Sequence, residues 1–155
     1  MQLSCVCQEQ YIYMNLKATH DCREELRNAD LKITPARLDV LHILERSDIP
    51  IDAATILSDL QKQNILIDKV TVFRILNSLT DKGILRPIQF NEGKLRYEYA
   101  AKPKHHHFIC ERCGKIIDIE GCVLDSLQKD IEKKKGVLVK RHSLEFFGLC
   151  ADCQK

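Results

Sequence analysis

Two pairs of cysteines, each with two residues between its members, constrain this chain more than any other feature of its sequence. Cys110 and Cys113 form the first pair, and Cys150 and Cys153 form the second. The C-x-x-C spacing lets two thiolates bind one ion from a tight turn, and Gly114 follows the first pair as such a turn permits. Four thiolates around one ion make the closed tetrahedral shell of structural zinc. The sequence therefore predicts that Zn²⁺ joins the two pairs.

A thioredoxin-type redox pair and four unrelated thiols are the alternatives. A redox C-x-x-C is expected where a helix begins in a βαβ setting, and neither pair has that setting. The N-terminus lacks the basic segment of a signal peptide, because its first lysine is Lys17. The longest uncharged apolar runs have only a few residues, whereas a membrane span needs about 20. We therefore expect a cytoplasmic protein without a membrane segment, in which disulfides are disfavoured.

The cysteine pairs belong to a small unit, expected over residues 105–155, whose core is too small to be stable without such a staple. Strand-like runs occupy 105–110, 115–119 and 137–147, and a helical stretch occupies 123–135. This pattern predicts a small α/β domain.

The preceding residues have the pattern of several helices followed by a β-hairpin. A first helix is expected within 15–29, and cap signals at Thr34-Pro35, Asp52 and Asp68 begin three more. Two β-like runs follow, at Ile84–Phe90 and Leu95–Tyr99, joined by a glycine-containing turn.

Helices followed by a hairpin describe a winged helix-turn-helix. The predicted fold is therefore α+β, with a DNA-binding domain over 1–100, an N-terminal extension at 1–29, a hinge at 101–104 and the second domain at 105–155.

The helix after Asp68 has one apolar side and one polar side. Its apolar residues are Val72, Phe73, Leu76 and Leu79. Thr71, Arg74 and Ser78 project together at i, i+3 and i+7. Such a surface suits the major groove of DNA, where arginine reads guanine and hydroxyls hold phosphates. A solvated face of an unrelated helical domain is the alternative.

The small net charge predicts that any DNA binding depends on a local basic patch. The chain has 24 Lys+Arg and 22 Asp+Glu, a net charge of +2, which is too balanced for binding by bulk charge. We expect Arg86 and Lys94 of the hairpin to meet phosphates beside the polar helix face. The hairpin favours DNA binding over the solvated alternative.

Together these features resemble the ferric uptake regulator (Fur) family of metal-responsive transcription factors. The resemblance runs from about residue 30 to the C-terminus, about four-fifths of the chain. The motifs that carry it are Leu31-Lys-Ile-Thr-Pro-Ala-Arg37, Thr71-Val-Phe-Arg-Ile-Leu-Asn77, Arg96-Tyr-Glu98, His105-His-His-Phe-Ile-Cys110-Glu-Arg-Cys113-Gly-Lys and Phe147-Gly-Leu-Cys150-Ala-Asp-Cys153. It implies a homodimer built through the C-terminal domains that binds a palindromic operator on double-stranded DNA. DNA contacts are implied for Lys32, Thr71, Phe73, Arg74 and Ser78.

The resemblance also implies a regulatory metal site near the hinge, formed by Glu98, His105 and His107 with Asp118 as a further carboxylate. One carboxylate and two imidazoles suit Fe²⁺, Mn²⁺, Co²⁺ or Zn²⁺. On a strand, His105 and His107 share a face while His106 points the other way. A solvated cluster or a tag is the alternative, but tags are terminal and this run directly precedes a C-x-x-C.

The sequence differs from that of known family members in two places that affect which metal it senses. Pro50 stands where iron- and peroxide-sensing members bring a histidine, and the hairpin at 84–99 lacks the cysteine on which zinc-sensing members rely. Fe²⁺ is favoured over Zn²⁺ and Mn²⁺ because the donors are only carboxylate and imidazole.

Other metal ligands are also implied. A third site of His106, Asp125 and His142 matches a further family site in part, since Lys104 replaces one histidine. Cys5, Cys7, His20 and Cys22 are weaker candidates for completing or guarding a metal site.

The sequence thus predicts a metal-dependent DNA-binding repressor that senses a divalent cation and controls metal-homeostasis or oxidative-stress genes. The alternative is a zinc-stapled protein-interaction or RNA-binding module without a sensing role. The cluster of Glu98, His105 and His107 favours the repressor over this module, because a purely structural module does not need a second set of metal ligands. No enzymatic activity is expected, since no nucleophile–base pair or phosphate-binding loop is apparent.

Overall fold

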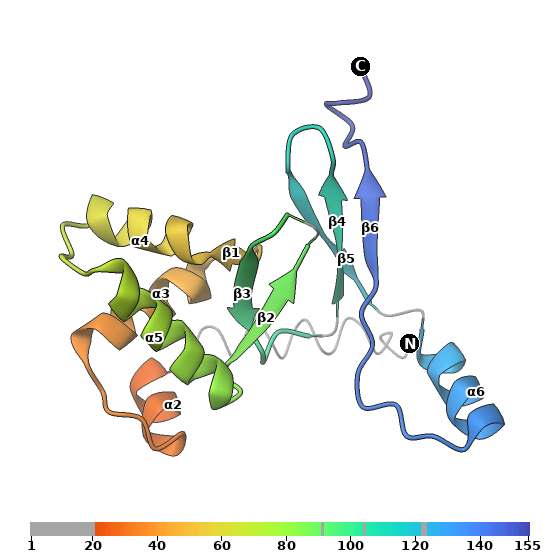
Figure 1. The fold of residues 1–155 in the computed structure, drawn as a ribbon, viewed down its shortest axis with the longest axis horizontal. Coiled ribbons are helices and arrows are strands. Elements are labelled where there is room, and N and C mark those ends of the chain that lie inside the picture. The colour runs from red at the N-terminus through yellow and green to blue at the C-terminus, as the bar shows by residue number, and fades with distance from the viewer. Residues whose placement is uncertain (1–20, 91, 104, 122–123) are drawn as a thin grey trace, which may run out of the picture. The chain divides into compact units, whose positions relative to one another are not determined.

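A computed structural model describes residues 21–155 apart from 91, 104, 122 and 123, and these residues fall into two compact units (Figure 1). The first unit ends at Lys102 and the second begins at Pro103. The predicted α+β fold is confirmed: helices and a hairpin make the first unit, and a small α/β sheet makes the second. Within the described residues, no helix is both long and apolar enough to cross a membrane. The predictions that concern Cys5, Cys7 and His20 lie outside these residues.

The first unit contains α2 (Cys22–Asn28), α3 (Pro35–Arg46), α4 (Ala53–Lys62) and α5 (Lys69–Asp81). The predicted caps are confirmed, because each capping side chain accepts a hydrogen bond from a backbone N–H three residues later. Thr34 accepts from Arg37 at 3.3 Å, Asp52 from Thr55 at 2.8 Å and Asp68 from Thr71 at 2.9 Å. Each cap satisfies an N–H group that the first helical turn leaves without a partner.

A three-stranded antiparallel sheet closes the first unit in the order β1–β3–β2. Its strands are β1 (Ile51–Asp52), β2 (Leu85–Gln89) and β3 (Leu95–Tyr99). The predicted hairpin is confirmed, with Pro87 opposite Tyr97 at its centre. Fully buried side chains from all four helices form one core with this sheet: Leu26, Val40, Leu41, Ile56, Leu60, Val72, Leu76 and Leu79.

One expectation about the first unit is wrong, and another stays untested. Phe73, which the pattern assigned to the apolar side of its helix, is 39% exposed, because Ile75 takes the buried position. The hairpin cations are engaged within the unit: Lys94 Nζ lies 2.7 Å from Asp52 Oδ2, and Arg86 Nε lies 3.6 Å from Glu98 Oε1. Both side chains remain partly exposed, so their contact with DNA phosphates stays a prediction.

The second unit has a sheet in the order β5–β4–β6 and one helix. Its elements are β4 (His105–Cys110), β5 (Ile116–Glu120), α6 (Asp125–Lys135) and β6 (Glu145–Gly148). β4 pairs antiparallel with β5 and parallel with β6.

The strand predicted over 137–147 is wrong for most of its length, since only its end belongs to β6. Side chains of α6 explain this. Val139 donates its N–H to Glu132 at 2.9 Å, and its carbonyl accepts from Gln128 at 3.0 Å. These bonds use the backbone groups that a strand would need.

Asp52 joins the hairpin to the start of α4, and replacing it by alanine should cost about 1–2 kcal/mol of unfolding free energy. Burial alone would raise the pKa of Asp52, but hydrogen bonds from Lys94 and Thr55 hold it at about 2. Because the folded pKa is depressed, this contribution is present above the unfolded pKa of about 4 and is lost as pH falls through about 2. Urea unfolding at pH 7 and at acidic pH measures it.

The control for this prediction is Asp59→Asn. Asp59 makes only an exposed ion pair with Lys62, at 2.8 Å, and its loss should cost no more than about 0.5 kcal/mol. An equal cost for both variants, or a cost for Asp52→Ala that does not shrink in acid, would contradict the assignment.

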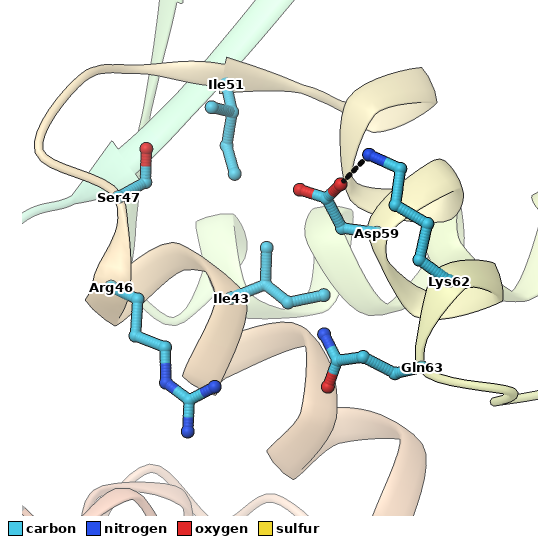
Figure 2. A pocket seen from close by; sticks show the side chains of 7 residues that line it. All are labelled: Ile43, Arg46, Ser47, Ile51, Asp59, Lys62 and Gln63. Carbon is cyan, nitrogen blue, oxygen red and sulfur yellow. Dashed lines mark hydrogen bonds and ion pairs between the residues drawn. The ribbon is translucent and has the colours of Figure 1, made fainter.

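A surface pocket of about 460 Å³ lies between α3, β1 and α4 (Figure 2). Ile43 and Ile51 extend into it, and the ion pair of Asp59 and Lys62 borders it. None of the residues that line it belongs to a cluster of metal ligands or is a buried polar group. We therefore assign it no ligand.

Candidate metal centres and nucleic-acid interface

The two C-x-x-C turns meet because β4 and β6 are parallel neighbours. Cys110 ends β4 and is paired with Gly148, which ends β6, so both chains leave the sheet at the same edge. The first turn is closed by a bond of 2.8 Å from the N–H of Gly114 to the carbonyl of Cys110. A left-handed φ of +70° at Gly114 follows. In the second turn, the N–H of Cys153 donates to the carbonyl of Cys150 at 2.9 Å.

The four sulfur atoms all lie within 4.8 Å of one another. Cys113 Sγ and Cys150 Sγ are 3.7 Å apart, and the N–H of Cys150 donates to Cys110 Sγ at 3.3 Å. Tetrahedral zinc with Zn–S bonds of about 2.3 Å requires sulfurs about 3.8 Å apart. The four cysteines therefore fit a structural Zn²⁺ site.

The thiols of this cluster differ widely in pKa, and a bound cation would favour the thiolate form of each. Hydrogen bonds from backbone N–H groups, first that of Cys150 and then that of Cys113, lower the pKa of Cys110 to about 6. Partial burial, and then hydrogen bonds with the other three thiols, raise the pKa of Cys153 to about 12. Four adjacent thiolates repel one another, whereas a bound divalent cation stabilises all of them.

The histidine strand β4 presents alternate side chains to opposite faces of its sheet. His105 Nε2 and His107 Nε2 lie 3.1 Å apart, and His107 Nε2 lies 3.5 Å from Asp118 Oδ1 on the neighbouring strand β5. His105 Nδ1 lies 2.7 Å from the carbonyl oxygen of Pro103, an acceptor that makes Nδ1 the protonated nitrogen. In that tautomer, Nε2 is the ring nitrogen that can bind a metal ion.

Within the second unit, the structure brings together three of the four residues predicted for the regulatory site, His105, His107 and Asp118. The fourth, Glu98, belongs to the first unit, where it lies on β3 opposite Arg86. Pro50, which replaces a histidine of the family, is fully buried in the first unit.

His106 faces the other side of β4, towards His142. Their ring centroids lie 5.6 Å apart, and His106 is only 7% exposed. Among the described residues, no hydrogen-bond partner meets its Nε2. Burial, followed by repulsion from His142, lowers the pKa of His106, so the ring is neutral and able to ligate. Asp125, the third predicted ligand, begins α6, but its side chain lies outside the described ones.

The polar side of α5 is the candidate nucleic-acid interface. Val72, Ile75, Leu76 and Leu79 are buried, while Arg74 and Phe73 are exposed and Thr71 and Ser78 are half-buried. Lys32 is exposed just before α3.

Two side chains differ from what sequence reasoning had suggested for this interface. The hydroxyl of Thr71 donates to Asp68 at 2.6 Å and so takes part in the helix cap. Sequence reasoning missed Lys69, an exposed cation whose Nζ lies 5.8 Å from the ring centroid of Phe73. A lysine in the first turn of this helix was the available signal.

A model of the ferric uptake regulator family matches residues 28–147. The chain belongs to the ferric uptake regulator (Fur) family. The resemblance drawn from the motifs is thereby confirmed. A ferric uptake regulation protein of Yersinia pestis is 37% identical over 136 residues, which are 84% of this chain and 88% of that protein.

Solved Fur structures share the architecture. The Vibrio cholerae ferric uptake regulator is 33% identical, with a TM-score of 0.75 over 84% of this chain and 100% of that one. The Helicobacter pylori ferric uptake regulator is 25% identical, with a TM-score of 0.74 over 100% of this chain and 97% of that one. That protein is described as having three functional metal-binding sites.

Proposed function

We propose that this Fur-family protein is a metal-dependent DNA-binding repressor that senses a divalent cation. The observation that carries the proposal is the presence of two different donor sets in the second unit, beside a winged-helix unit that exposes Arg74. One set consists of four thiols, and the other of the imidazoles of His105 and His107 with the carboxylate of Asp118. A zinc-stapled protein-interaction or RNA-binding module would use the thiols and would not need the second set.

The donor chemistry divides the metals between the sites. Cys110, Cys113, Cys150 and Cys153 hold structural Zn²⁺, and Glu98, His105, His107 and Asp118 hold the sensed ion. Imidazole and carboxylate donors suit Fe²⁺, Mn²⁺ and Zn²⁺. Fe²⁺ is the favoured ion, and several relatives of this chain are named ferric uptake regulation proteins. His106, Asp125 and His142 form the third candidate site.

The order of the ligands along the chain supports a clamp. Glu98 precedes the boundary between the units and His105 follows it, so an ion that binds both restrains the hinge at 101–104. In a homodimer this would set the spacing of the two α5 helices on a palindromic operator. Metal and DNA binding would then be reciprocally coupled, typically by about 1–3 kcal/mol. The regulated genes are those of metal homeostasis or oxidative stress.

Selection of duplexes from a random DNA pool, with Fe²⁺ under anaerobic conditions, with Mn²⁺ and without added metal, tests this function. We expect a palindromic sequence to be enriched only when a divalent cation is present. A single-stranded RNA pool offered in parallel should yield no enrichment. Enrichment of RNA alone, or of no DNA sequence with any metal, would contradict the proposal and favour the interaction module.

Arg74→Ala should weaken binding to the selected duplex by about 1–3 kcal/mol if the guanidinium makes a bidentate contact with a base. Its effect on random duplex should be smaller. Lys69→Ala should weaken both by similar factors, because a lysine at the start of the helix meets phosphate. Lys62→Ala, an exposed cation on α4, is the matched control. Fluorescence anisotropy at fixed salt measures the DNA affinity of the parent and the three variants. If Arg74→Ala binds the selected duplex as tightly as the parent, α5 does not lie in the major groove.

A further inference from the structure

The first unit contains a group of metal-ligating side chains that belongs to none of the sites above. Cys22 is the first residue of α2, and His42 and Glu45 lie on α3. One ligand atom from each of the three lies within 4.8 Å of the others. Cys22 Sγ is 3.9 Å from Glu45 Oε2 and 3.7 Å from the hydroxyl oxygen of Tyr99. All these residues lie within one compact unit.

Local structure explains why these residues meet. His42 and Glu45 stand three residues apart on a helix and so share a side of it. Leu41 and Leu44, each next in sequence to one of this pair, are buried in the core, as is Leu26 of α2. The packing of α2 against α3 in this core places Cys22, which is only 4% exposed, beside the polar pair.

We propose that Cys22, His42 and Glu45 bind a zinc ion in the winged-helix unit, distinct from the four-cysteine zinc. A thiolate, an imidazole and a carboxylate are the three donor types that Zn²⁺ uses in proteins, and three protein ligands leave a fourth position for water. The geometry requires little movement, because tetrahedral zinc places its sulfur and oxygen ligands about 3.6 Å apart. His42 is exposed, so its ring can adjust without disturbing the core.

The charges around Cys22 also favour a cation. Burial is the main cause that raises the pKa of its thiol. A hydrogen bond with Tyr99 opposes this effect, and the carboxylates of Glu45 and Glu25 raise the pKa further. The sulfur is thus set among acidic groups on two helices, which repel one another as anions. A divalent cation turns that repulsion into attraction.

The proposed ion would join α2 to α3 and would lie beside Tyr99 on β3. Its expected effect is therefore to fix α2 on the winged-helix unit. The inference does not rest on the proposed function, because zinc content and stability report it without DNA. A purely structural cluster of Cys22, Glu45 and Tyr99 would give no role to His42, and the experiment uses that difference.

The test is a Co²⁺ titration of the full-length protein that retains its four-cysteine zinc. The sensing and third sites contain no thiol, so a sulfur-to-cobalt charge-transfer band reports a site with a cysteine. We expect one equivalent of Co²⁺ to produce the band in the parent and Zn²⁺ to displace it. Cys22→Ala should abolish the band, and His42→Ala and Glu45→Gln should weaken Co²⁺ binding at least tenfold.

Glu24→Gln is the matched control, since Glu24 is an exposed carboxylate on α2. It should leave the titration unchanged. Thermal unfolding with and without added Zn²⁺ is the second readout, and the increase in melting temperature should disappear in His42→Ala, which removes an exposed side chain and should fold. The proposal is overturned by a parent without the band, by a band that persists in Cys22→Ala, or by unchanged affinity in both His42→Ala and Glu45→Gln.

Discussion

Replacing Cys110 by serine should release the structural zinc and unfold the second unit. Within the described part of that unit, the buried hydrophobic residues are Ile109, Cys110, Ile116 and Cys150, two of which are proposed zinc ligands. So small a core cannot hold the sheet without the metal. Zinc binding in small domains is worth about 10–16 kcal/mol of folding free energy. Elemental analysis should find one fewer tightly held zinc per chain, and circular dichroism should show the loss of structure.

Controls separate loss of the metal from a general folding defect. Glu111→Gln changes an exposed residue inside the same turn and should keep the zinc. Stripping zinc from the parent with a chelator should reproduce the unfolding, and returning zinc should reverse it. Cys153→Ser should behave like the Cys110 variant. If either serine variant stays folded as a dimer with its zinc intact, the four-cysteine assignment is wrong.

The second large effect is expected from His105→Ala combined with His107→Ala. This double variant should keep the structural zinc and the dimer, because neither side chain belongs to the four-thiol site. It should lose the metal-stimulated part of DNA affinity, a factor of about 5–150 for coupling of the usual size. Isothermal titration with Mn²⁺ should show one binding event fewer than in the parent.

The control for this pair is His142→Ala, which removes a proposed ligand of the third site only. We expect it to keep most of the metal response. If the DNA affinity of the double variant still rises with metal, the sensing role belongs instead to the site of His106, Asp125 and His142.

Local chemistry made much of the fold predictable. Thr34, Asp52 and Asp68 each cap a helix by accepting a hydrogen bond from the backbone N–H three residues later. Such caps involve neighbouring residues only and can be predicted from a short stretch of sequence. The two C-x-x-C pairs could also be predicted as metal-binding pairs, because a single turn sets the distance between the two thiols of each pair. The alternation of His105 and His107 on one face of β4 follows from the period of a strand.

Contacts between distant segments were not predictable. The ion pair of Lys94 with Asp52 could not be predicted, because the two residues lie far apart in the chain and only folding brings them together. The segment 137–144 has apolar residues that resemble a strand, yet Gln128 and Glu132 of α6 hold its backbone. Cys22, His42 and Glu45 form no motif, since packing of α2 on α3 alone unites them. Phe73 is exposed, whereas Ile75, two residues later and so on roughly the opposite side of the helix, is buried with Leu76.

A DNA-binding isotherm on the selected duplex, at one fixed salt concentration, tests the central claim most directly. It compares the parent and the His105→Ala, His107→Ala variant, each with its structural zinc, with and without added divalent metal. The account predicts that metal tightens binding of the parent by about 5–150-fold and leaves the variant unchanged. A parent whose affinity is the same with and without metal would contradict it.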